Sequence, residues 1–260
     1  MPARYHSFLQ QCENLACLMK TGMGTRFSKL KDFALRLATV WFYLGSWMTP
    51  LHAMDTTEEV YHYQEVTGES VKEVAWQLCK GATYILTYAS PAERHVTTTG
   101  PDYDTRRWQV TADNGRTYFS AERTGRAILV RGTFKGEPVD KRLEIDECPW
   151  YQATSLSLRE LVASIDSERV FWTIRIDTLT AHKIRAIKQG IESIEADGVE
   201  IALLRIRLTL PGLLAPFWKS DYWFALPEGI FFRFKGPSGP PGSPMTIVNR
   251  TKGLRRWPPN

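Results

Sequence analysis

Apolar and polar residues alternate along most of the chain, and this period of two constrains the fold more than any other feature. The alternation recurs in four segments, whose apolar positions are Val74, Trp76 and Leu78; Trp108, Val110 and Ala112; Val170, Trp172, Ile174 and Ile176; and Leu204, Ile206, Leu208 and Leu210. Successive side chains of a strand point to opposite faces of the sheet. The repeated pattern therefore predicts antiparallel strands with one buried face.

Turn signals separate these segments. The pair Asn114-Gly115 suits a type I′ hairpin turn, because both residues tolerate positive φ angles. A strand–turn–strand order predicts a meander, in which strands that are neighbours in sequence also pair in space. Residues 181–195 are ambiguous, because their isoleucines are spaced as in a helix, whereas Gly190 and the following Asp197-Gly198 favour a strand. We expect a strand there.

One short helix is predicted near residues 157–166. Ser157 and Glu160 have the spacing of a capping box, and Leu158 and Leu161 begin an apolar stripe. A curved sheet with one apolar face must cover that face. We therefore expect an all-β fold with minor α content, a strongly curved antiparallel meander that forms an open barrel over this helix.

A leader precedes the predicted barrel. The uninterrupted apolar run from Leu37 to Met48 has 12 residues, fewer than the roughly 20 that span a bilayer. Basic residues lie upstream, and Leu51-His52-Ala53 follows Pro50. This layout predicts a secretory signal peptide within residues 1–53, with the start near Met23, cleavage after Ala53 and export to the bacterial periplasm. An anchor in the inner membrane formed by residues 33–53 is the alternative.

The charge balance of the remaining chain limits its possible partners, and its cysteines raise the question of a disulfide. Residues 54–260 carry 27 Lys and Arg against 26 Asp and Glu, and this balance argues against a nucleic-acid surface. We expect a single domain over residues 54–250 and a basic, disordered tail over 251–260, which offers a peripheral contact to acidic lipids. Cys79 and Cys148 could pair in an exported protein, with two buried thiols as the alternative.

Four segments carry a resemblance to known proteins, namely "RLEIDECPWYQATSLSLRELVAS", "RVFWTIRIDTL", "LTLPGLLAPFWKSDYWF" and "RFKGPSGPPGSP". Together they resemble a group of exported bacterial proteins of unknown function that look like the open β-barrel of the lipoprotein carriers LolA and LolB. The resemblance spans roughly residues 57–250. It implies a curved sheet over a short helix, and it transfers no functional residue to this chain.

The candidate binding residues are large aromatic side chains on predicted strands. If the helix leaves part of the apolar face open, the remaining groove suits a hydrophobic or lipid-like ligand. The candidates for its wall and mouth, set against an ordinary core role, are Trp76, Trp108, Trp172, Trp218, Lys219, Tyr222 and Trp223. Lys219 would meet an anionic head group.

The sequence gives weaker evidence for catalytic or metal sites than for a binding groove. His62, His95 and His182 lack metal-ligand spacing, and no cofactor motif is present. Asp102 and Asp104 could form a carboxylate pair, but the preceding Gly-Pro favours a turn. We expect a non-catalytic binding protein without a cofactor. The alternatives are a structural or interaction module of the cell envelope, which could have an envelope protein as partner, and an enzyme of unrecognised type.

Overall fold

The computed structural model describes residues 57–196, 198–237, 239 and 242–252. The predicted leader, with Met23 and Ala53, lies outside these residues. So does the predicted tail from residue 253 onward. Thr251 and Lys252 belong to the last strand, because backbone pairing with β1 continues to Lys252. The last strand therefore extends two residues beyond residue 250, where we expect the domain to end.

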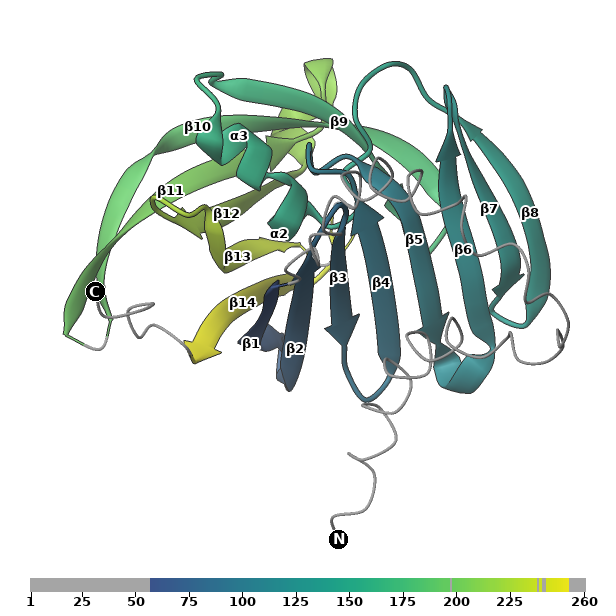
Figure 1. The fold of residues 1–260 in the computed structure, drawn as a ribbon, viewed down its shortest axis with the longest axis horizontal. Helices are drawn as coiled ribbons and strands as arrows, with labels where there is room; N and C mark the ends of the chain where they lie inside the picture. The colour runs from purple at the N-terminus through teal and green to yellow at the C-terminus, as the bar shows by residue number, and fades with distance from the viewer. Residues whose placement is uncertain (1–56, 197, 238, 240–241, 253–260) are drawn as a thin grey trace, which may run out of the picture. The chain divides into compact units, whose positions relative to one another are not determined.

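The described residues form one antiparallel sheet of 14 strands (Figure 1). The strands are β1 (Thr57–Thr67), β2 (Ser70–Lys80), β3 (Tyr84–Ala89), β4 (Glu93–Thr99), β5 (Thr105–Ala112), β6 (Thr117–Thr124), β7 (Ala127–Phe134), β8 (Glu137–Glu144), β9 (Glu168–Arg175), β10 (Thr180–Ala196), β11 (Val199–Thr209), β12 (Lys219–Ala225), β13 (Ile230–Pro237) and β14 (Met245–Lys252). The short helices are α2 (Thr154–Ser157) and α3 (Arg159–Ala163), with 3-10 turns η1 (Asp113–Gly115) and η2 (Gly212–Phe217).

The strand order confirms the predicted meander. It runs β8-β7-β6-β5-β4-β3-β2-β1-β14-β13-β12-β11-β10-β9, so β14 returns to pair with β1, and β8 and β9 form the two edges. The sheet curves around α2 and α3, which lie on its concave side (Figure 1). The fold is therefore an open, strongly curved barrel, as the sequence predicted. No helix in the described part of the chain is long and apolar enough to cross a bilayer.

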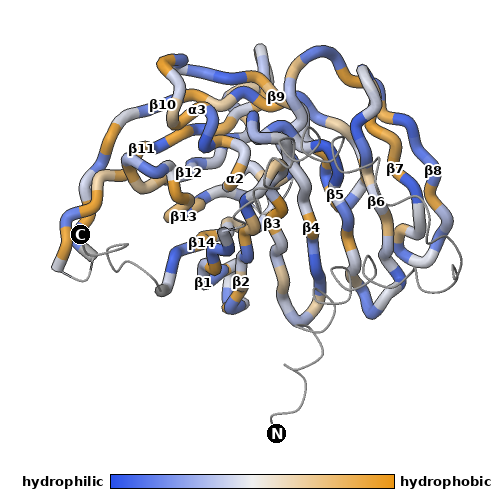
Figure 2. Tube along the Cα trace, in the orientation of Figure 1, coloured by the Kyte–Doolittle hydropathy of each residue, from blue (hydrophilic) through white to orange (hydrophobic). Residues whose placement is uncertain are grey.

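Alternation sets the buried face in most strands. Val74 and Leu78 of β2 and Trp108 and Val110 of β5 are buried, as predicted. Figure 2 shows hydrophobic and hydrophilic residues following one another along the strands. Residues 180–196 form strand β10, which confirms the expectation of a strand around Gly190.

Strand β9 departs from the predicted pattern. Phe171 lies between the predicted core positions Val170 and Trp172, yet it is fully buried and packs with the helices, whereas Val170 is only partly buried. Ile174 packs in a second cluster with β5–β7. Both faces of this edge strand therefore contact apolar neighbours, so the expectation of a single buried face does not hold for β9.

The helix begins three residues earlier than predicted and contains no capping box. Ser157 is the last residue of α2 and is fully buried, and its Oγ atom has no hydrogen-bond partner among the described residues. Glu160 accepts a hydrogen bond from the Tyr151 hydroxyl at 2.7 Å and pairs with Arg169 at 2.9 Å. Tertiary partners thus replace the local cap that the sequence pattern suggested.

Cys79 and Cys148 are not joined in a disulfide. Cys79 lies in β2, whose register places it opposite Glu58 and Ile85. Cys148 lies beyond β8, where its backbone N–H donates to Asp146 Oδ1 at 3.1 Å. The pKa of the Cys148 thiol is raised, first by burial and then by Asp146. The sequence could not place these two segments relative to each other.

A strap formed by residues 145–152 joins the two halves of the sheet. On one side, Thr105 N–H of β5 donates to the Trp150 carbonyl at 2.7 Å. On the other side, the strap forms a parallel bridge to β9, in which Tyr151 N–H donates to the Trp172 carbonyl at 2.8 Å. The Gln152 side chain bonds both the N–H and the C=O of Ile174 at 3.0 Å. The strap therefore protects part of the β9 edge and links it to β5.

Asp146 fastens this strap by its charge. Its carboxylate accepts from Trp172 Nε1 at 2.7 Å and contacts the Lys183 ammonium group. The hydrogen bond from Lys183 is the largest cause that holds the pKa of Asp146 well below its ordinary value of 3.8. A carboxylate with a lowered folded pKa stabilises the protein above its unfolded pKa and loses that effect as the pH falls.

We therefore expect Asp146→Asn to destabilise the protein at pH 7 and to do so less at acid pH. The difference in unfolding free energy between the two proteins should be largest above about pH 5 and should shrink below about pH 4. Urea unfolding at a series of pH values measures this difference. A difference that stays constant down to pH 2.5 would show that Asp146 does not fasten the strap by its charge.

Candidate functional site

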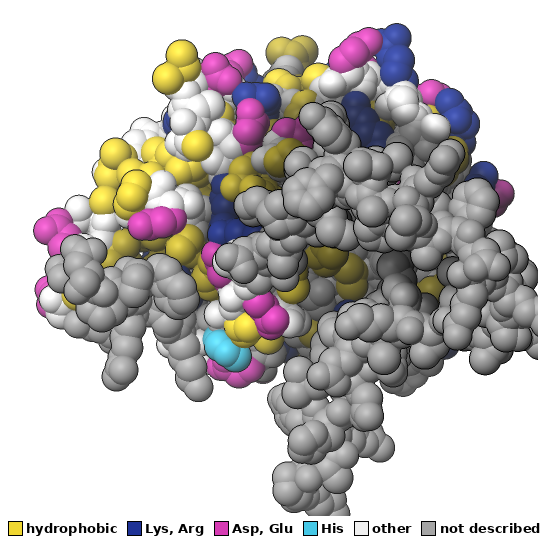
Figure 3. Space-filling view, in the orientation of Figure 1, with side chains coloured by type: hydrophobic (Ala, Val, Ile, Leu, Met, Phe, Trp, Pro, Cys, Tyr) yellow, Lys and Arg dark blue, Asp and Glu magenta, His cyan; other side chains and the backbone are white. Residues whose placement is uncertain are grey.

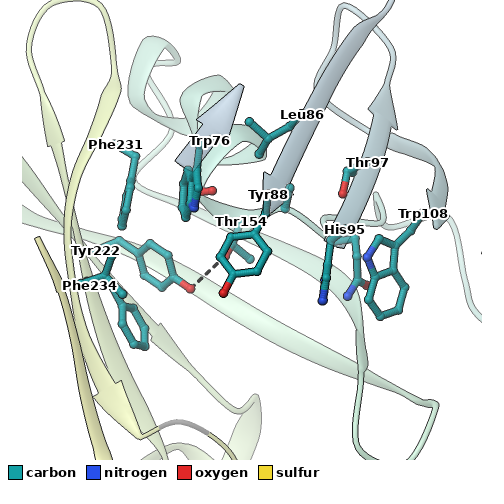
Figure 4. A pocket seen from close by; sticks show the side chains of 14 residues that line it. Trp76, Leu86, Tyr88, His95, Thr97, Trp108, Thr154, Tyr222, Phe231 and Phe234 are labelled. Carbon is teal, nitrogen blue, oxygen red and sulfur yellow. Dashed lines mark hydrogen bonds between the residues drawn. The ribbon is translucent and has the colours of Figure 1, made fainter. Parts of the chain in front are cut away.

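A small cavity lies between the strap and the middle of the concave face. Its volume is about 230 Å³, and its wall includes Trp76, Tyr88, His95, Trp108, Tyr222 and Phe231. Figure 4 shows these side chains around one space, with Trp76, Tyr88 and His95 coming from β2, β3 and β4. Trp76 stacks on Phe231 with ring centroids 5.0 Å apart. The wall is therefore aromatic and held by ring packing.

A larger cavity of about 720 Å³ adjoins the small one. Five residues line both spaces, namely Gln152, Thr154, Tyr222, Phe234 and Val248. Much of its remaining wall is apolar and includes Phe171, Ile174, Ile184, Leu208, Leu210 and Trp218. The two cavities together form what we call the concave groove. The larger cavity falls within the range of about 300–1,000 Å³ that small-molecule sites occupy.

Tyr222 stands where the two cavities meet. The hydroxyls of Thr154 in α2 and Tyr222 in β12 form a hydrogen bond at 2.9 Å, which Figure 4 draws as a dashed line. Burial raises the pKa of Tyr222 to about 12. The phenol therefore stays neutral, and its hydrogen bond links α2 to β12 where the two cavities meet.

The polar groups of the small cavity include one unpartnered donor, because the buried Trp76 Nε1 has no hydrogen-bond partner among the described residues. His95 Nε2 lies 3.1 Å from Glu93 Oε2, and the His95 ring meets the Tyr88 ring edge-on at 5.4 Å. The hydrogen bond from His95 is the largest cause that lowers the pKa of Glu93. Burial raises the pKa of Tyr88. His95 and Glu93 therefore form a hydrogen-bonded pair beside the small cavity.

The larger cavity carries an ion pair between Arg175 and Asp177. Arg175 Nε donates to Asp177 Oδ1 at 3.0 Å, and the hydrogen bond from Arg175 is the largest cause that lowers the pKa of Asp177. His182 lies 2.9 Å from Thr180 Oγ1, and burial lowers its pKa. Glu65 also faces this cavity, with Lys72 at 4.0 Å.

The structure brings four of the seven predicted site residues into the groove. Trp76 and Trp108 line the small cavity, Trp218 lines the large one, and Tyr222 lines both. They come from β2, β5, the end of the β11–β12 loop and β12. Trp172, Lys219 and Trp223 line neither cavity.

These three residues have other surroundings. Trp172 Nε1 donates to Asp146 in the strap, and the Lys183 ammonium lies 5.1 Å from the centre of the Trp172 ring. Trp223 follows the inward-facing strand position of Tyr222, so it points to the outer face. There it packs in a small cluster with Leu203 and Phe232. Lys219 is exposed on β12.

Two apolar side chains away from the groove are also exposed to solvent. Ile191 and Val199, in the long β10–β11 hairpin, are 64% and 43% exposed. Figure 3 shows hydrophobic side chains over β10 and β11 among acidic and basic ones. These positions lie apart from both cavity walls.

Sequence reasoning missed several wall residues. Leu208 could have been selected, because it lies on the buried face predicted for residues 204–210. His95 was considered above only as a metal ligand, yet it lies on the cavity wall beside Trp108. No sequence pattern marked Gln152 and Thr154 as wall residues, because only the path of the strap brings them to the groove.

No group of three or more His, Cys, Asp or Glu side chains among the described residues could hold a metal ion. Asp102 and Asp104, considered above as a carboxylate pair, both take part in local contacts. Asp104 accepts from Trp150 N–H at 2.8 Å and pairs with Arg123 at 2.9 Å. Asp102 Oδ1 accepts from Asp104 N–H at 3.3 Å. The turn interpretation of "GPDYD" is confirmed.

The fold is an open β-barrel, and solved structures with a similar fold exist. It is similar to a β-barrel-like protein of domain of unknown function DUF1849 from Brucella abortus, with a TM-score of 0.51 and 8% identity over 76% of this chain and 96% of the other. The predicted resemblance to open-barrel proteins of unknown function is thereby confirmed at the level of fold. No family model and no curated protein matches the sequence.

A second similar structure is a LolA superfamily protein from Nitrosomonas europaea. The match covers 79% of this chain and 89% of the other at 9% identity, with a TM-score of 0.25. At this score the likeness supports no conclusion about the groove.

We expect Tyr222→Phe to lower the unfolding free energy by about 0.5–1.5 kcal/mol, because it removes the hydrogen bond between the partly buried hydroxyls of Tyr222 and Thr154. Urea denaturation of the purified protein measures the loss. Tyr118→Phe is the matched control, since Tyr118 is 59% exposed and should tolerate the change. Equal midpoints for the two variants would show that the hydroxyl bond does not anchor α2.

Proposed function

We propose that this protein binds a hydrophobic, lipid-like ligand in the concave groove and catalyses no reaction. The observation that carries the proposal is the larger cavity of about 720 Å³, whose wall includes apolar side chains from β9, β10 and β11. Such concave, mostly apolar spaces with a few placed polar groups are typical of small-molecule sites.

The charges around the groove favour a ligand without a strong net charge. Arg175 is paired with Asp177, and Glu65 lies 4.0 Å from Lys72. A ligand with an unpaired ionic group would have to break one of these pairs or leave its own charge uncompensated, which is costly away from water. An elongated apolar chain in the larger cavity, with a compact, weakly polar end among the aromatic side chains, fits the groove better.

The predicted signal peptide supports a site of action outside the cytoplasm. A binding protein in the bacterial periplasm would hold an insoluble molecule in an aqueous compartment, where a covered apolar groove lowers the free energy of that molecule. Anchoring by residues 33–53 instead of cleavage would leave the same groove on a tethered protein.

The competing function is a structural module whose concave face is filled by its own side chains. The helices favour it in part, because Leu156, Leu158 and Leu161 already cover the sheet and are fully or almost fully buried. Ligand binding distinguishes the two functions.

We expect the purified protein to bind a fluorescent fatty acid and Val248→Trp to weaken that binding at least tenfold by filling the groove. Val248 lines both cavities. Ile247→Trp is the matched control, because the preceding residue of β14 points to the opposite face. Fluorescence titration gives the affinities, and native mass spectrometry of protein from its own cells would detect a co-purifying lipid. No uptake by the unaltered protein and a clean apo mass would favour the structural module.

A further inference from the structure

Three large apolar side chains are exposed at one end of the barrel, two in the β11–β12 loop and one at the start of β14. Leu213 is 94% exposed and Phe217 is 68% exposed, both in η2 of the β11–β12 loop. Met245, the first residue of β14, is 51% exposed. Exposed side chains of this size cost free energy in water and mark contact surfaces when they gather at one place.

The β11–β12 and β13–β14 loops form the mouth of the larger cavity. Trp218, which follows η2, and Gly239 of the β13–β14 loop both line it, and Trp218 Nε1 donates to the Gly239 carbonyl at 2.9 Å. Ile176, 37% exposed after β9, lines the cavity from the neighbouring hairpin. We call Leu213, Phe217 and Met245 the apolar rim. None of the three lines the cavity itself.

The surroundings of the apolar rim include exposed cations. Lys219 and Lys235 are exposed on β12 and β13. The nearby carboxylate of Asp221 is paired with Arg207 at 2.9 Å, which neutralises it. Glu69 is the acidic residue of the adjoining β1–β2 turn and is exposed. Isolated apolar side chains on loops beside lysines match the interface of an anionic bilayer, where rings and aliphatic groups enter and ammonium groups stay at the head groups.

We infer that the apolar rim docks on a lipid bilayer and holds the mouth of the groove against it. This inference rests on the proposed function, because an insoluble ligand can then pass between bilayer and cavity without crossing water. The contact is reversible, since a few apolar side chains and two lysines give far weaker attachment than a spanning helix.

An environment-sensitive fluorophore at residue 213 tests the docking on the full chain. Leu213→Cys is labelled with NBD after the four native cysteines are changed to serine, and vesicles of phosphatidylglycerol and phosphatidylcholine are added. Val60→Cys is the control position, because Val60 is 52% exposed on β1 toward the other end of the barrel. The site-specific probe reports insertion of the rim even if residues 33–53 also attach the chain to vesicles.

We expect the fluorescence at residue 213 to shift to the blue and to be quenched by nitroxide-labelled lipid, while the probe at residue 60 stays unchanged. Lys219→Glu with Lys235→Glu should reduce the shift on anionic vesicles. An unchanged probe at residue 213, or one that responds only to an added protein, would overturn the inference.

A second measurement separates failure of the docking from failure of the proposed function. The double variant Leu213→Ser, Phe217→Ser should bind fatty acid in solution with unchanged affinity. Its uptake of fluorescent fatty acid from vesicles should be slower by at least about tenfold. Uptake at the normal rate would overturn the docking and leave the groove as the binding site. Insertion of the probe without any fatty-acid binding would instead retain the docking and overturn the proposed function.

Discussion

The structure depends on the way in which residues 145–152 connect the two halves of an unclosed sheet. A meander that ends at β8 and restarts at β9 has two free edges, and free edges invite pairing with other chains. The strap gives part of the β9 edge a parallel partner at Trp172 and gives β5 a hydrogen bond at Thr105. It thereby fixes the distance between the halves, and the concave groove follows from that distance.

The groove exists because the helices are short. Together α2 and α3 span only Thr154–Ala163, so they cover the middle of the concave face and leave aromatic and aliphatic side chains facing open space beside them. Thr154 and Gln152 lie at the helix start and in the strap, and both line the two cavities. The parts that hold the sheet open therefore also shape the site, and the loops at its mouth carry the exposed apolar side chains.

Local patterns predicted the strands and their pairing well and the site incompletely. The inward positions of β2 and β5 follow from alternation, which a strand imposes on any sequence. The edge strand β9 does not follow it, because Phe171 packs with the helices and Ile174 packs with β5–β7. Trp172 and Trp223 looked equivalent to Trp76 and Trp108 as strand-borne rings. In the structure, however, Trp172 contacts the strap and Trp223 lies on the outer face of the sheet, so neither faces the groove.

By itself the sequence determined the all-β class, the meander order and the strand character of residues 180–196. These follow from the period of two and from turn residues, which act between near neighbours. The tertiary structure alone decided where the sheet stays open, which aromatic residues share a cavity, and that Cys79 and Cys148 are not joined. Each of these depends on the separation of segments far apart in the chain. That separation is set by sheet curvature and by the strap, and no local pattern encodes it.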